Sequence, residues 1–164
     1  MVAIANRMMA LDSKRHNYFV IFFFIFSNGE DRQKAEDYVS LRLRSGMGNK
    51  DLERSRKAIT NSLFTVSLYE KEELIGFGRI VGDGGITYVV SDIMVDKNYR
   101  RKGFADKIMK EINNYFEQNT FEDSYICLIA NSPADLLYHK YQFEYLPPNK
   151  CGMLREQKNF HKFK

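Results

Sequence analysis

The sequence predicts a single α/β domain in which helices cover a central sheet. Strand-like apolar runs and helix-like segments follow one another along the chain, and the run at residues 86–95 leads through a short basic loop into an amphipathic segment. The length of 164 residues suits one domain with a proper core, and no repeat, linker or low-complexity segment divides it. We therefore expect residues 17–164 to form one domain, preceded by a loose tail of residues 1–16 that shows no clear period.

The first part of the chain predicts one strand and two helices. Residues 18–26 are the most apolar stretch and indicate a core strand, which a Ser-Asn-Gly turn ends. Residues 32–44 have a moderate helical period, and the glycine-containing segment 45–49 interrupts it. Asp51 can cap a second helix that runs to about residue 62.

The middle of the chain predicts a hairpin and a central strand. Residues 63–69 and 74–81 are strand-like, and a solvated Glu-Lys-Glu-Glu turn joins them. The glycine-rich turn at residues 82–85 precedes the strand at residues 86–95, whose unbroken apolar run indicates burial on both faces. A helix with one apolar face then runs from Gly103 to about residue 118.

Four shorter elements complete the expected order. They are a strand at residues 124–130, a short helix at residues 134–141, and strands at residues 143–146 and 150–155 on either side of Pro147 and Pro148. The order is then β-α-α-β-β-β-α-β-α-β-β.

The composition is that of a soluble globular protein without a strongly charged partner. The 25 Lys and Arg exceed the 21 Asp and Glu by only four, and no long basic run is present, so a nucleic-acid partner is not indicated. Residues 18–26 have about half the length that a membrane span requires. Cys127 and Cys151 form no metal-ligand or redox spacing and fit a reducing compartment, so we expect a cytoplasmic protein.

The loop from Arg100 to Ala105 favours an anion. Three cations, Arg100, Arg101 and Lys102, stand beside Gly103 at a predicted helix start, where unpaired backbone N–H groups and the helix dipole attract a phosphate. The loop lacks the Gly-Lys-Ser/Thr ending of a P-loop and the three glycines of a dinucleotide fingerprint. A basic turn that merely caps a helix is the plainer reading of the same residues.

Two motifs resemble the GNAT N-acetyltransferase superfamily. Val95, four intervening residues and then Arg100-x-x-Gly103-x-Ala105 resemble its acyl-CoA loop, Arg/Gln-x-x-Gly-x-Gly/Ala. Residues 134–143 resemble its short helix ending in Tyr-x-Lys-x-Gly-Phe, although Gln142 stands where glycine is usual. The resemblance covers roughly residues 20–155. It implies a mixed, mostly antiparallel sheet that splays between strands 4 and 5, acetyl-CoA as acyl donor, and no metal.

The resemblance also assigns the residues that would hold the cofactor. Backbone groups of Ile93 and Val95, with Met94 between them, would pair with the pantetheine arm like an added strand. The N–H groups of Arg101, Lys102, Gly103, Phe104 and Ala105 would hold the pyrophosphate, and Arg100 would add charge. Asn131 would offer an amide to the arm. Arg101 and Lys102 as solvated cations, and Asn131 as a turn residue, are the alternatives.

Two side chains are candidates for proton transfer. By resemblance, Tyr138 would protonate the departing thiolate; its alternative role is packing against Phe143. Asp92 lies in the central strand, where burial would raise its pKa toward that of a useful base. A substrate anchor and a structural acceptor are equally open roles for Asp92, and proton removal through ordered water is a further route.

The acceptor is less defined than the donor. In this fold it is bound by the first two helices, their loop and the last hairpin, here residues 43–49 and 145–153. The resemblance therefore implies an N-acetyltransferase, and we expect it to act on a small-molecule primary amine by direct attack. A peptide N-terminal acetyltransferase, an acyl-CoA-binding regulatory module without turnover, and a homodimer stay open.

Overall fold

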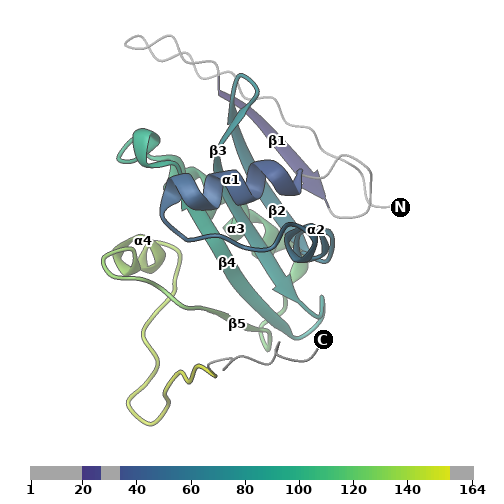
Figure 1. Cartoon of the computed structure of the whole chain (residues 1–164). Helices are drawn as coiled ribbons and strands as arrows, with labels where there is room; N and C mark the ends of the chain where they lie inside the picture. The colour runs from purple at the N-terminus through teal and green to yellow at the C-terminus, as the bar shows by residue number, and fades with distance from the viewer. Residues whose placement is uncertain (1–19, 27–33, 156–164) are drawn as a thin grey trace.

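A five-stranded sheet lies between two helical layers (Figure 1). The computed structural model describes residues 20–26 and 34–155, so the predicted tail, the turn after the first strand and the first residues of the first predicted strand and helix lie outside the described residues. The strands are β1 (Val20–Phe26), β2 (Phe64–Glu70), β3 (Glu73–Gly82), β4 (Thr87–Val95) and β5 (Tyr125–Leu128). They follow one another in space as they do in sequence, antiparallel from β1 to β4 and parallel between β4 and β5. This is the mixed, mostly antiparallel sheet that the resemblance of the two motifs implies.

The helices divide between the two faces of the sheet. They are α1 (Ala35–Ser45), α2 (Leu52–Thr60), α3 (Phe104–Asn119) and the short α4 (Asp135–His139), with a single 3-10 turn η1 (Lys97–Tyr99) after β4. One core cluster joins α1 and α2 to the sheet through Tyr38, Ile59 and Phe77. A larger cluster joins α3 to the other face through Ile108, Met109 and Ile112. In Figure 1, α1 and α2 lie in front of the strands and α3 lies behind them.

The helix boundaries follow from local chemistry. The Asp51 side chain accepts a hydrogen bond from the Arg54 N–H at 2.9 Å and caps α2 as predicted. Gly46 ends α1 in the left-handed conformation with φ 80°. The loop that follows therefore turns sharply from α1 to α2 and passes over the carboxyl half of β4, where it lines the sites described below.

A bulge in β4 changes which side chains face which layer. Phe77 pairs with Met94 and Arg79 pairs with Ser91, so Gly78 alone lies opposite two residues, Asp92 and Ile93. Tyr88 and Val90 face the α3 cluster before the bulge, whereas Met94 faces the α1 cluster after it. Asp92 adopts a φ of 56°, which a non-glycine residue rarely adopts. The bulge thus directs the Asp92 carboxylate toward α1 and α2.

Gly78 is small because the α3 helix passes directly over it. A Cβ atom there would lie 2.5 Å from Cγ2 of Ile108 and 2.7 Å from Cδ1 of Ile93. The prediction of a bulge or a close backbone approach at the β3 glycines is confirmed at Gly78 for the bulge, and the crowding there comes from the side chains of Ile108 and Ile93.

The last two predicted strands are wrong. Within the described range 34–155, no strand follows β5, and residues 143–155 form a loop beyond α4 that turns at Pro147–Lys150 (Figure 1). Pro147 and Pro148 lack the N–H groups that a ladder needs, and Tyr145 and Leu146 are exposed instead of packed. None of the helices in the described part of the chain combines the length and hydrophobicity that a membrane crossing requires.

Candidate functional site

The site begins where β4 and β5 separate. Their pairing runs from Thr87 with Tyr125 to Val90 with Leu128 and then stops, although β4 continues to Val95. A cavity of about 580 Å³ occupies the resulting gap. Backbone groups on this edge of β4, from Ser91 onward, have no β5 strand to pair with in the described residues. The gap can therefore accept an extended ligand that pairs with the backbone like a strand.

Seven of the predicted cofactor residues line this cavity, and four do not. Those that line it are Ile93, Met94, Val95, Arg100, Ala105, Asn131 and Tyr138. Phe104 is instead buried in the α3 core, and the side chains of Arg101 and Lys102 are exposed at the loop surface. Lys102 places its Nζ atom 5.0 Å from the centre of the Tyr99 ring. A role for these residues in the site therefore rests on their backbone N–H groups.

The backbone of this loop is shaped for an anion. Gly103 is the N-cap of α3 with φ 79°, and Arg101 also has a positive φ of 61°. The first turn of a helix leaves its N–H groups without intrahelical partners, and the helix dipole adds positive potential there. No heavy atom lies within 4 Å of where a Gly103 Cβ would stand, so the approach to these N–H groups is open. The loop and the neighbouring edge of β4 can therefore accept an extended ligand that carries a phosphate group.

Arg100 ties the loop to the neighbouring elements. Its NH2 group donates a 2.6 Å hydrogen bond to the Ser45 carbonyl at the end of α1, and its Nε donates more weakly to the Val95 carbonyl at 3.4 Å. The guanidinium therefore fixes the relative position of α1, β4 and the anion loop while it contributes charge to the cavity.

Tyr138 lies on α4 at the cavity wall. Its hydroxyl has no hydrogen-bond partner among the residues that the structure describes, and its ring packs edge-on against Phe143 with centroids 6.3 Å apart. Burial raises the pKa of the Tyr138 phenol above its ordinary value, so the group keeps its proton at neutral pH. The alternative packing role and a proton-donor role are thus compatible in one side chain.

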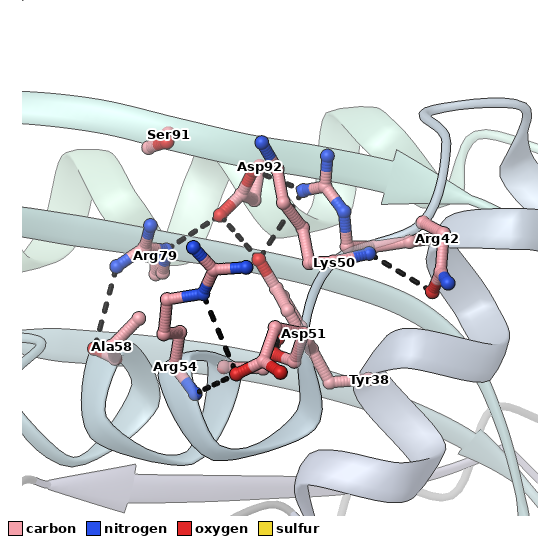
Figure 2. A pocket seen from close by; sticks show the side chains of 11 residues that line it. Tyr38, Arg42, Lys50, Asp51, Arg54, Ala58, Arg79, Ser91 and Asp92 are labelled. Carbon is pink, nitrogen blue, oxygen red and sulfur yellow. Dashed lines mark hydrogen bonds and ion pairs between the residues drawn. The ribbon is translucent and has the colours of Figure 1, made fainter. Parts of the chain in front are cut away.

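A second cavity, of about 720 Å³, opens on the α1–α2 side of the sheet (Figure 2). Its lining comes from α1, the α1–α2 loop, α2, β3 and β4: Tyr38, Arg42, Asn49, Lys50, Asp51, Arg54, Ser55, Ala58, Arg79, Ser91 and Asp92. Ser91 and Asp92 also line the first cavity. The two cavities therefore meet at the β4 bulge.

Asp92 is the centre of a hydrogen-bonded network in the second cavity (Figure 2). Its Oδ1 accepts from Arg42 at 2.7 Å, and its Oδ2 accepts from Arg79 at 2.6 Å and from the Tyr38 hydroxyl at 2.8 Å. Burial pushes the pKa of Asp92 upward, but Arg79, the Tyr38 hydrogen bond and Arg42 outweigh it and hold the pKa below its ordinary value. The rise in pKa expected from the sequence is wrong, because burial comes with two cations.

The partners of Asp92 were missed in the sequence. Tyr38 and Arg42 stand four residues apart on α1, and Arg79 lies across the sheet from Ser91. Charged side chains in an apolar hairpin and an Arg–Tyr pair at helical spacing are the signals that point to them. Elsewhere in the described part of the chain, no three His, Cys, Asp or Glu side chains come together in a way that suits a metal ion.

Comparison with known proteins places the chain in a family. A family profile described as "Acetyltransferase (GNAT) domain" matches residues 44–152. A crystal structure of a probable acetyltransferase from methicillin-resistant Staphylococcus aureus is 38% identical, covers 84% of this chain and 99% of its own, and superposes with a TM-score of 0.76. A search of curated proteins found no significant match.

More distant structures share the fold. A GNAT-family acetyltransferase from Streptococcus pneumoniae is 23% identical over 85% of this chain and 98% of its own, with a TM-score of 0.67. The ribosomal-protein-S18-alanine N-acetyltransferase from Escherichia coli is 14% identical over 77% of this chain and 79% of its own, with a TM-score of 0.60. The matched domain covers more than half of the chain and includes both motifs and the gap between β4 and β5; this protein belongs to the GNAT family of acetyltransferases.

Proposed function

We propose that the protein transfers an acetyl group from acetyl-CoA to a primary amine of a small molecule, by direct attack of the amine on the thioester. The observation that supports this most strongly is the meeting of two cavities at Ser91 and Asp92. One cavity suits the donor arm, and the other gives an acceptor its own route to the same point of β4. When both reactants are bound side by side in the correct orientation, the reaction between them becomes effectively unimolecular, which lowers its entropic barrier.

The β4 backbone carries the donor side of the proposal. Ile93 and Val95 pair with the pantetheine arm, Met94 lies between them, and the N–H groups from Arg101 to Ala105 hold the pyrophosphate. Asn131 offers its amide from the opposite wall. A backbone N–H of β4 near the bulge stabilises negative charge that develops on the thioester oxygen during attack.

Tyr138 acts as the general acid. The amine forms the new C–N bond, the C–S bond breaks, and the leaving thiolate takes the phenolic proton. The phenolate then recovers a proton from water, which balances the proton that the amine gives up to water. A thiol with a pKa near ~8.5 is a tolerable leaving group even without help, so the proton contributes only part of the rate enhancement. The raised pKa of Tyr138 keeps the proton available throughout the neutral range.

Asp92 acts as a structural hydrogen-bond acceptor in this proposal rather than as the base. A carboxylate with a lowered pKa is a weak base. Its three hydrogen bonds instead fix the positions of Arg42, Arg79 and Tyr38. The attacking amine therefore loses its proton to water, one of the routes that the sequence left open.

A turnover assay tests the proposal. The protein is mixed with acetyl-CoA and a panel of small amines, amino acids and short peptides, and products are identified by mass spectrometry. We expect N-acetylated small amines together with stoichiometric CoA. If only peptide N-termini are acetylated, the protein is a peptide N-terminal acetyltransferase and the proposed small-molecule acceptor is wrong. If CoA binds but no acceptor is acetylated, the protein is the acyl-CoA-binding regulatory module.

A further inference from the structure

The floor of the second cavity contains more positive than negative charge. Arg42 and Arg79 share the single carboxylate of Asp92, and the three side chains are only 6%, 15% and 10% exposed. The pKa of Tyr38, the third partner, is raised by burial and by the Asp92 carboxylate, so this phenol donates a hydrogen bond without adding charge. Two buried guanidinium groups thus face one anion. A buried cation without a matching anion is unfavourable, so this floor favours a further negative group.

Of the two arginines, Arg79 retains donors for a ligand. Arg42 is held by the Gly48 carbonyl through Nε and by the Met47 carbonyl through NH2, in addition to Asp92. Arg79 uses its Nε for Asp92, while its NH1 reaches Ala58 and Ser62 only at 3.4 Å. Its NH2 group has no hydrogen-bond partner among the described residues.

The rim of the cavity adds two more cations (Figure 2). Lys50 has no ion-pair partner within the described residues, and Arg54 has a loose 3.4 Å contact with Asp51 while its side chain is 78% exposed. Asp51 already caps α2. The lining as a whole therefore holds four cations, Arg42, Lys50, Arg54 and Arg79, against the two carboxylates of Asp51 and Asp92.

The geometry points to an acceptor that carries an anionic group, a carboxylate or a phosphate, on the same small molecule as its amine. Arg79, Lys50 and Arg54 hold the anion, and the amine extends toward Ser91, where the cavities meet. This inference rests on the proposed function and narrows its acceptor class. Amines with several positive charges are disfavoured, because the net charge of the lining repels them.

Matched acceptors test the inference. Ethanolamine, serine and O-phosphoethanolamine share an aminoethyl-oxygen skeleton and differ in having no anionic group, a carboxylate or a phosphate. Their kcat/KM values are compared at equal concentrations of neutral amine, in a phosphate-free buffer of fixed ionic strength. Calorimetric titration of each compound into CoA-saturated protein gives a second readout that does not require turnover. We expect at least one anionic compound to bind and react better than ethanolamine, and the better of the two identifies the anion.

Substitutions on α2 supply the internal control. Arg54→Gln is expected to raise the KM of the anionic acceptor roughly threefold to tenfold with kcat retained, because an exposed charge contributes modestly to binding. Arg56→Gln is the matched control: Arg56 lies two residues along the same helix, is exposed, and pairs with Glu36 outside the cavity lining. Its KM should match the parent. Arg54→Glu should reduce the preference for the anionic compound further.

The outcomes separate the two proposals. If ethanolamine binds as tightly as both anionic compounds, or if Arg54→Gln and Arg56→Gln behave alike, the acceptor inference is overturned while the acetyltransferase proposal stands. If no amine is acetylated, the proposed function fails, and calorimetry still decides whether the cavity prefers an anion.

Discussion

Replacing Tyr138 by phenylalanine removes one hydroxyl and leaves the ring in place. The hydroxyl makes no hydrogen bond to the described residues, and the edge-on contact of the ring with Phe143 is retained, so nothing that holds α4 is lost. We expect the free energy of unfolding to change by less than about 1 kcal/mol. The effect should appear in the chemical step.

The size of that effect follows from the leaving group. General acid catalysis typically contributes a hundredfold or more, but a thiolate of pKa near ~8.5 needs less help than an alkoxide. We expect kcat to fall between about tenfold and several hundredfold, a loss of roughly 1.4 to 3.5 kcal/mol of transition-state stabilisation. The affinity for CoA should stay near that of the parent, because the substitution leaves unchanged the backbone groups that we propose to bind the pantetheine arm.

The assay measures CoA release at saturating acetyl-CoA and amine, with CoA affinity measured separately by calorimetry. Tyr141→Phe is the matched control: three residues along, the Tyr141 hydroxyl donates to the Asp106 carbonyl at 2.8 Å and lies outside the donor cavity. This control should lose about 1 kcal/mol of stability and keep its kcat. Parental kcat in Tyr138→Phe, or equal losses in both variants, would refute the acid role.

Two further substitutions, one matched control variant and a ligand titration test the rest of the site. Gly103→Val and Gly48→Val both place a side chain at a positive φ with open space around it, so both should lose similar stability, but only Gly103→Val should weaken CoA binding; equal CoA affinity in both would make the loop a simple cap. Asp92→Asn should lose about 3 kcal/mol of stability at neutral pH, since it breaks a buried ion pair. Because the folded-state pKa of Asp92 is lowered, its contribution is complete above the unfolded value near ~3.9 and is lost as pH falls through the folded pKa, so parent and variant should converge in acid unfolding titrations. In Asp92→Asn, kcat/KM should still rise with pH as it does in the parent, because in this proposal water takes the proton of the amine. A pH profile of kcat/KM that becomes flat in this variant would identify Asp92 as the base. CoA at about a hundred times its Kd should stabilise the parent by roughly 2.7 kcal/mol in thermal melts, and no shift would remove the donor site.

The loop that we propose for the phosphates of the donor is predictable from the sequence because its chemistry is local. The spacing from Val95 through Arg100 and Gly103 to Ala105 fixes a strand end, an anion loop and a helix start within a short stretch. Residues so close in sequence need no knowledge of tertiary packing to be brought together. Phe104 is the exception, since its side chain completes the α3 core while only its N–H faces the loop.

The acceptor side is not predictable in the same way. Arg42 and Arg79 meet Asp92 only because α1 packs across β3 and β4 and because the bulge turns Asp92 toward that helix. Neither the packing angle of a helix nor the position of a bulge is encoded in a nearby pattern of residues. The same contacts explain why the pKa of Asp92 is lowered, whereas the sequence predicts that burial raises it.

In the C-terminal segment, a local pattern predicts strands that the structure does not contain. Residues 143–146 and 150–155 have apolar residues that suggest strands, but local β propensity decides little when two prolines interrupt the ladder and no partner strand adjoins.

Initial-rate kinetics with both substrates test the central claim of this account most directly. The claim is that donor and acceptor occupy separate cavities at the same time and react directly at the β4 bulge. Initial velocities are measured over a matrix of acetyl-CoA and acceptor concentrations, and the protein incubated with acetyl-CoA alone is weighed by intact mass spectrometry. Simultaneous occupancy predicts intersecting double-reciprocal lines and an unmodified protein mass. Parallel lines together with an acetylated protein that passes its acetyl group to the amine would contradict direct transfer.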